Sequence, residues 1–66
     1  MEDVPLGFLF KISQNNKAMN FYSSLSETQR KSISQYLQNC TDGEEAKQKL
    51  NTAITNLENN NLSFIQ

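Results

Sequence analysis

Residues 25–40 read LSETQRKSISQYLQNC and predict one amphipathic helix with its own start signal. Ser26 and Gln29 stand three residues apart, the spacing of a capping box in which each side chain bonds the backbone amide of the other residue. Glu27 places a carboxylate at the positive end of the helix and stands four residues before Lys31, with which it can pair. We therefore expect the helix to begin with Ser26 as its N-cap.

The apolar residues of this stretch fall on one face of a helix. Ile33, Tyr36, Leu37 and Cys40 recur at helical spacing. The opposite face is polar and carries Arg30, Lys31, Ser34, Gln35 and Gln38. Because one helix cannot bury its own apolar stripe, the rest of the chain or a second chain has to cover it.

Upstream, residues 3–5 read Asp-Val-Pro and predict the start of another helix, because proline is tolerated in the first turn. Phe8, Leu9 and Ile12 then form an inward stripe. Asn15 is expected to cap a short second helix, which runs directly into the helix that starts at Ser26.

Leu6 and Phe10 stand four apart on a different side of the first helix. We favour the interpretation that a small core wraps around this helix and buries both sides; the alternative is that the pair stays exposed as a contact surface. The tail 62–66, with Leu62, Phe64 and Ile65, is apolar again. It either folds back to cover the bundle or continues into something that lies outside these 66 residues. If a partner exists, these five apolar residues are its expected surface.

The last helix is predicted from a second capping signal and a clean apolar stripe. Thr41 and Glu44 are in capping-box register, and residues 42–45 are rich in carboxylates. Glu45 and Lys49 can pair four residues apart. Asn59-Asn60-Asn61 predicts the end of the helix, since asparagine tolerates the left-handed conformation.

These signals predict an all-α fold, a small bundle of three to four short helices in a single domain over residues 1–66, with residues 4–59 as its core and residues 60–66 as an apolar tail. No segment has the alternation of a strand. The predicted core consists of Phe8, Leu9, Ile12, Ala18, Phe21, Tyr22, Leu25, Ile33, Tyr36, Leu37, Cys40, Leu50, Ala53, Ile54 and Leu57.

Composition limits the chemistry. The 66 residues include one cysteine and no histidine, so an internal disulfide and the usual zinc spacings are excluded. Cys40 is expected to be structural, because no histidine or cationic cluster is placed to stabilise a thiolate. The carboxylates at the start of the last helix are explained by the helix end, and a histidine triad or a glycine-rich phosphate loop is ruled out. We expect no enzyme, no metal, no cofactor and no small-molecule ligand.

Charge and hydropathy indicate which partners and which cellular location to expect. Six basic and seven acidic residues give a net charge of −1, so no global field attracts nucleic acid or anionic lipid. The apolar run after the acidic start is short and broken by Lys11, which is wrong for a signal peptide or a membrane span. We expect a cytoplasmic protein.

A helix-turn-helix that binds DNA is the alternative that the sequence leaves open. In that interpretation the groove-facing residues would be Lys47, Lys49, Asn51, Thr52, Thr55 and Asn56, with Arg30 and Lys31 on phosphate. The acidic net charge and the carboxylates at the start of the supposed recognition helix argue against it.

A series of positions combines proline, spaced apolar residues, a capping asparagine and a basic pair: Pro5, Phe8, Ile12, Asn15, Ala18, Phe21, Tyr22, Leu25, Ser26, Arg30, Lys31, Ile33, Tyr36, Leu37, Leu50, Ala53, Ile54 and Leu57. This series resembles the C-terminal helical segment of the bacteriocin-protection, OmpD-associated family. The chain departs from that pattern at Glu45-Ala46, where relatives carry a Thr-Arg step, in the run 47–49, and at Tyr36, where they tend to carry tryptophan. The resemblance implies a bacterial protein linked to tolerance of bacteriocins or antimicrobial peptides, and it brings no catalytic residue. Together with the composition, it predicts a non-enzymatic helical interaction module that binds a protein partner or a second copy of itself.

Overall fold

The structure, a computed structural model, describes residues 4–65. Four α-helices and one 3-10 turn lie within this range. The elements are α1 (Leu6–Ser13), α2 (Asn16–Ser23), α3 (Glu27–Gln38), α4 (Gly43–Glu58) and the 3-10 turn η1 (Ser63–Ile65). No strand occurs between residues 4 and 65. The predicted small all-α bundle is confirmed.

The start of α3 is the predicted capping box. The Gln29 amide donates to the Ser26 hydroxyl oxygen at 3.2 Å, and the Ser26 amide donates to Gln29 Oε1 at 3.0 Å. The helix ends at Gln38, two residues before the predicted end. There the Asn39 backbone leaves the helical region, and the Cys40 amide bonds the Gln38 carbonyl at 3.0 Å. Cys40 therefore lies in the loop.

Asn15 caps α2 as predicted, because its side-chain oxygen accepts from the Ala18 amide at 3.1 Å. At α1 the N-cap is Pro5, with an extended ψ of 146°, so the helix begins at Leu6. Asp3, which the sequence also placed at this helix start, lies outside the described residues. At the far end of the chain Asn60 has a φ of 56° and ends α4, as its residue type predicted.

The predicted N-cap of α4 is wrong by one residue. Asp42, not Thr41, occupies the cap, and its carboxylate accepts from the Glu45 amide at 2.8 Å. The Glu45 carboxylate in turn accepts from the Thr41 amide and hydroxyl, which fixes Thr41 just outside the helix. Glu44, the expected partner of Thr41, stays exposed.

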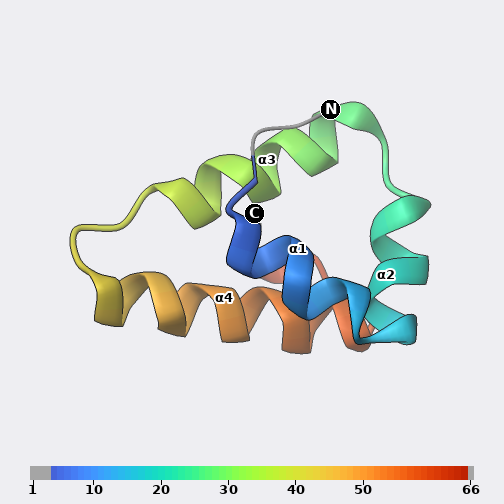
Figure 1. Cartoon of the computed structure of the whole chain (residues 1–66). Coiled ribbons are helices and arrows are strands. Elements are labelled where there is room, and N and C mark those ends of the chain that lie inside the picture. Colours follow the sequence, from blue (N-terminus) through green and yellow to red (C-terminus); the bar gives the residue numbers. More distant parts are fainter. Residues whose placement is uncertain (1–3, 66) are drawn as a thin grey trace.

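Helix α4 packs against every other element, and after the loop 39–42 it runs back along α3, its longest neighbour (Figure 1). Helices α1 and α2 pack on each other and on α4. The turn η1 packs on α3 and α4. The tail therefore folds back onto the bundle, which was one of the two alternatives predicted for it.

The buried apolar residues are Phe8, Ile12, Ala18, Tyr22, Leu25, Ile33, Leu37, Ala53 and Leu57, and all nine were predicted as core. The other predicted core residues are half-buried: Phe21, Tyr36, Leu50 and Ile54, which pack against the core, and Leu9 and Cys40. The Phe8 and Tyr22 rings meet edge to face with centroids 5.6 Å apart, which joins α1 to α2 at the centre of this core.

Two placements differ from the sequence-based expectation. Ser34, expected on the polar face of α3, is buried, and its hydroxyl accepts from Gln38 Nε2 at 3.2 Å, so the polar group is satisfied inside. Leu6 and Phe10, which we favoured as part of a wide core, are 82% and 65% exposed. Their burial would need a further element on the outer side of α1, whereas α1 rests on α2 and α4.

Candidate functional site

The outward side of α1 carries an apolar pair. Phe8 and Ile12 are fully buried, so their side of α1 faces the core. At 100° per residue, positions 6 and 10 fall on the opposite side of the helix, which leaves Leu6 and Phe10 next to each other in water. No other large apolar side chain in the described part of the chain is exposed to this degree.

An apolar hollow of about 230 Å³ includes Pro5 and Gly7, the chain neighbours of Leu6, in its lining. Its walls come from the start of α1, the end of α3 and the first turns of α4. It is lined by Pro5, Gly7, Leu37, Ala46, Lys47 and Leu50. A Cβ atom on Gly7 would lie 4.0 Å from Leu50 Cδ2, in ordinary van der Waals contact, so the hollow is open partly because Gly7 has no side chain. No local pattern in the sequence predicts this hollow, because its walls belong to residues far apart in the chain.

The tail residues of the predicted partner surface lie elsewhere. Leu62, Phe64 and Ile65 are half-buried and pack against the core. The Phe64 ring meets the Tyr36 ring edge to face, with centroids 5.2 Å apart. The turn that carries these residues contacts α3 and α4, whereas Leu6 belongs to α1. The structure therefore exposes the α1 part of the predicted surface and uses the tail to cover the bundle.

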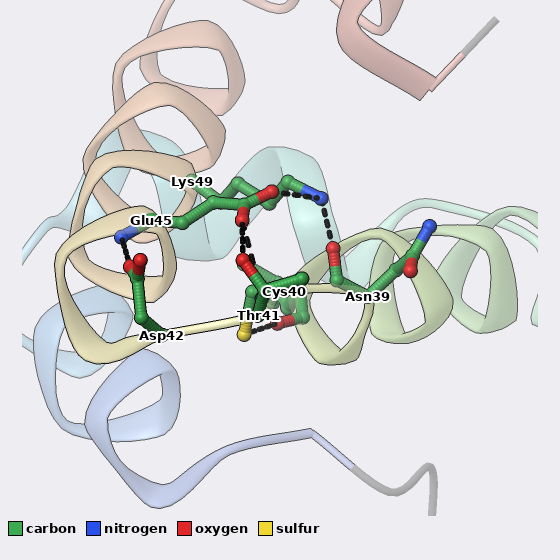
Figure 2. A network of polar contacts seen from close by, with 7 residues as sticks. Asn39, Cys40, Thr41, Asp42, Glu45 and Lys49 are labelled. Atoms are coloured by element: carbon green, nitrogen blue, oxygen red, sulfur yellow. Dashed lines mark hydrogen bonds and ion pairs between the residues drawn. The ribbon is translucent and has the colours of Figure 1, made fainter.

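A network of polar contacts joins the end of α3, the loop 39–42 and the start of α4 (Figure 2). The Glu45 carboxylate accepts from the Thr41 hydroxyl at 2.8 Å and from the Thr41 amide at 3.1 Å, and Lys49 Nζ lies 3.6 Å from it. The Lys49 ammonium also donates to the Asn39 carbonyl and sits 5.1 Å from the centroid of the Tyr36 ring. These contacts tie the end of α3 to the start of α4.

Hydrogen bonds from the Thr41 hydroxyl and amide hold the pKa of Glu45 below its ordinary value; desolvation acts in the opposite direction, and the Lys49 charge lowers the pKa further. At the start of α4, the Asp42 carboxylate thus caps the helix and the Glu45 carboxylate binds the loop. The Cys40 thiol is half-buried and donates to the Leu37 carbonyl at 3.8 Å. Both observations agree with the structural roles that we expected for Cys40 and for the carboxylates of residues 42–45.

The residues named for a DNA-binding interpretation are divided between different contacts. Lys49 is bound into the loop network, and Asn51 accepts from Lys11 Nζ at 3.2 Å. Asn56 donates to the Thr52 carbonyl at 2.7 Å. Asp42 caps the start of the helix that would enter the groove. The DNA-binding alternative stays a prediction to which these contacts add no support.

Within residues 4–65, no group of three or more cysteine and carboxylate side chains is arranged to hold a metal ion. None of the helices described in this range has the length and apolar character needed to cross a membrane. Comparison of the chain with models of protein families, with curated proteins and with solved structures found no match. The resemblance to the bacteriocin-protection, OmpD-associated family, and the tolerance it implies, stay predictions.

Proposed function

We propose that this chain is a non-enzymatic helical interaction module whose contact surface is the outward side of α1. The observation that carries the proposal is the exposure of Leu6 and Phe10, at 82% and 65%, four residues apart on one helix. Burying a large apolar side chain is worth about 1.5 to 3 kcal/mol. A partner that covers both side chains would gain this free energy, which the fold itself leaves unused.

The roles of the polar side chains support the non-enzymatic part of this proposal. Asp42 and Asn15 cap helices, and Ser26 bonds Gln29 in a capping box. Glu27 pairs with Lys31 at 3.8 Å, with both side chains largely in solvent. Groups engaged in helix ends and in pairs within one helix have a structural explanation and need no catalytic one.

The hollow beside α1 supports the interaction part. Interfaces between proteins combine apolar anchors with recesses that receive them, and the fully buried centre of such a patch is poor in charge. Here Leu6 and Phe10 supply the anchors and the hollow supplies a recess, with Lys47 as its charged lining residue. Pro5 and Gly7, two of the lining residues, flank Leu6 in the chain, which supports a contact surface that includes both features.

The test replaces both anchors in the full chain, as Leu6→Ser with Phe10→Ser. Because both side chains are exposed, we expect the free energy of unfolding in urea to stay within about 0.5 kcal/mol of the parent. Tagged parent and double variant are then used as baits with lysate from the source cells, and the captured proteins are compared, a second copy of the chain included. The matched control is Thr28→Ser with Gln35→Ser, two exposed positions on α3.

A protein held by the parent and by the control, and released by the double variant, is the expected result. If the double variant loses stability by several kcal/mol, the two side chains are core and the proposal fails. It fails as well if every captured protein is held equally by the double variant.

A further inference from the structure

The hollow between the start of α1, the end of α3 and the first turns of α4 has the walls of a small-ligand site. Its lining residues other than Lys47 carry no polar side chain: Pro5, Gly7, Leu37, Ala46 and Leu50. At the space that one water molecule takes in the liquid, about 230 Å³ holds roughly seven groups the size of a methylene. Apolar walls offer water few hydrogen bonds, so an apolar molecule displaces that water with a gain in affinity.

Lys47 adds one positive charge at the rim of this hollow. The residue lines the hollow and is exposed, as is typical of a lysine that packs its aliphatic stem on apolar surface and keeps its ammonium group in water. Nearby, Lys49 lies 3.6 Å from the Glu45 carboxylate, and Lys11 donates a hydrogen bond to α4. Lys47 has no hydrogen bond or ion pair with any residue between 4 and 65. Its charge is therefore available to a ligand.

Apolar walls with one unpaired cation at the rim are complementary to a molecule that has an apolar body and a single carboxylate. Glu44, the exposed carboxylate three residues before Lys47, does not line the hollow. We propose that the hollow binds a small monocarboxylate with an apolar body of roughly seven carbon atoms, the body against the apolar walls and the carboxylate at the Lys47 ammonium group.

This inference goes beyond the proposed function. Neither Leu6 nor Phe10 is among the lining residues, so the ligand site needs no protein partner. Composition alone indicated no small-molecule ligand, because the walls come together only where three helices pack.

Two substitutions test the walls and the charge separately. In Gly7→Leu the first carbon of the new side chain lies 4.0 Å from Leu50 Cδ2, so the side chain occupies the hollow, and leucine is also the better helix former. Lys47→Met removes the charge and keeps an unbranched apolar stem. The matched control is Lys17→Met, the same change at an exposed lysine of α2 that does not line the hollow.

The experiment follows the amide NMR spectrum of the full chain and the three variants at pH 7 and low salt, where an exposed charge acts most strongly. The probe is octanoate. Octylammonium has the same length with the opposite charge, and acetate has the carboxylate without the body. We expect octanoate to bind the parent with a dissociation constant of about 0.1 to 1 mM, and to shift the amides of residues 7, 37, 46, 47 and 50.

Octylammonium should bind the parent at least fivefold more weakly, and acetate should cause no shift up to about 10 mM. Octanoate should bind Gly7→Leu at least tenfold more weakly than the parent, Lys47→Met about three- to fivefold more weakly, and Lys17→Met equally well. The positions of the shifted amides in the parent locate the site even if Gly7→Leu does not fold.

No shift with octanoate up to about 10 mM overturns the ligand site, whereas the proposed function is decided separately, by whether capture from lysate depends on Leu6 and Phe10. Shifts confined to other residues, or unchanged binding in a folded Gly7→Leu variant, overturn the location. Equal binding of octanoate and octylammonium, or equal losses in Lys47→Met and Lys17→Met, overturn the carboxylate as the ligand class.

Discussion

Glu45 shows how a single carboxylate can stabilise a loop without being buried. Its pKa is lowered first by the hydrogen bond from the Thr41 hydroxyl, then by that from the Thr41 amide, with a smaller contribution from Lys49. The folded chain therefore binds this proton more weakly than the unfolded chain. The resulting stabilisation is fully present above the ordinary pKa of a glutamate and is lost as the pH falls through the lowered pKa of the folded state.

We predict that Thr41→Val reduces this pH dependence, because valine removes the hydroxyl donor and keeps the amide donor. Urea unfolding followed by circular dichroism between pH 7 and pH 3 measures it, and Glu45→Gln, which cannot ionise, is the reference. The loss of unfolding free energy on acidification should be largest in the parent, smaller in Thr41→Val and smallest in Glu45→Gln. Equal losses in the parent and Glu45→Gln would show that this carboxylate does not couple folding to protons.

At this scale the sequence predicts well where one local rule applies. The caps of α3 and α2 are hydrogen bonds within a single turn, between Ser26 and Gln29 and between Asn15 and Ala18. No distant residue is needed to place them. The start of α4 was missed by one residue because Thr41 with Glu44 and Asp42 with Glu45 have the same spacing. What decides between the two is the fold of the loop, in which Glu45 bonds Thr41 from inside the helix.

At the scale of elements, the turn η1 closes the bundle over α3. We predict that Phe64→Ala lowers the free energy of unfolding by about 1 to 2 kcal/mol, because it removes a half-buried ring and its edge-to-face contact with Tyr36. Urea unfolding measures the loss, and the capture of proteins from lysate by the same variant should be unchanged, because the tail lies outside the proposed contact surface. Leu6→Ser with Phe10→Ser is the counterpart, which should keep its stability and lose the captured protein. The opposite pair of results would move the contact surface from α1 to the tail.

The burial of Leu6 and Phe10 could not be settled from the sequence. Phe8 and Ile12 were expected to face the core, but Leu6 and Phe10 also form an apolar pair four residues apart, which a wide core could have buried as well. The outcome depends on how many elements surround the helix, and α1 rests on α2 and α4. The exposure of this pair was therefore predicted only as an alternative, and the apolar hollow depends on how α1, α3 and α4 pack, which local patterns do not specify.

At the scale of the whole molecule, α4 connects everything else. It packs on α1, α2, α3 and η1, and the Cα radius of gyration of 10.7 Å is that of a closely packed chain of this length. With nine buried apolar side chains the core is small, and no disulfide reinforces it. The free energy of unfolding expected for 66 residues is roughly 3 to 10 kcal/mol. The helices should therefore unfold together.

Leu57→Ala tests this cooperativity, because Leu57 is fully buried on α4. Removing a buried leucine side chain costs about 2 to 5 kcal/mol, a large part of the total. The matched control is Leu6→Ala, the same chemical change at an exposed position, with an expected loss below about 0.5 kcal/mol. In urea, far-UV circular dichroism reports all helices, and tyrosine fluorescence reports Tyr22 on α2 and Tyr36 on α3. If α4 couples the elements, both signals must shift to lower urea by the same amount in Leu57→Ala. Circular-dichroism and fluorescence transitions that separate would mean that the bundle does not unfold as one unit and that α4 does not unite its elements.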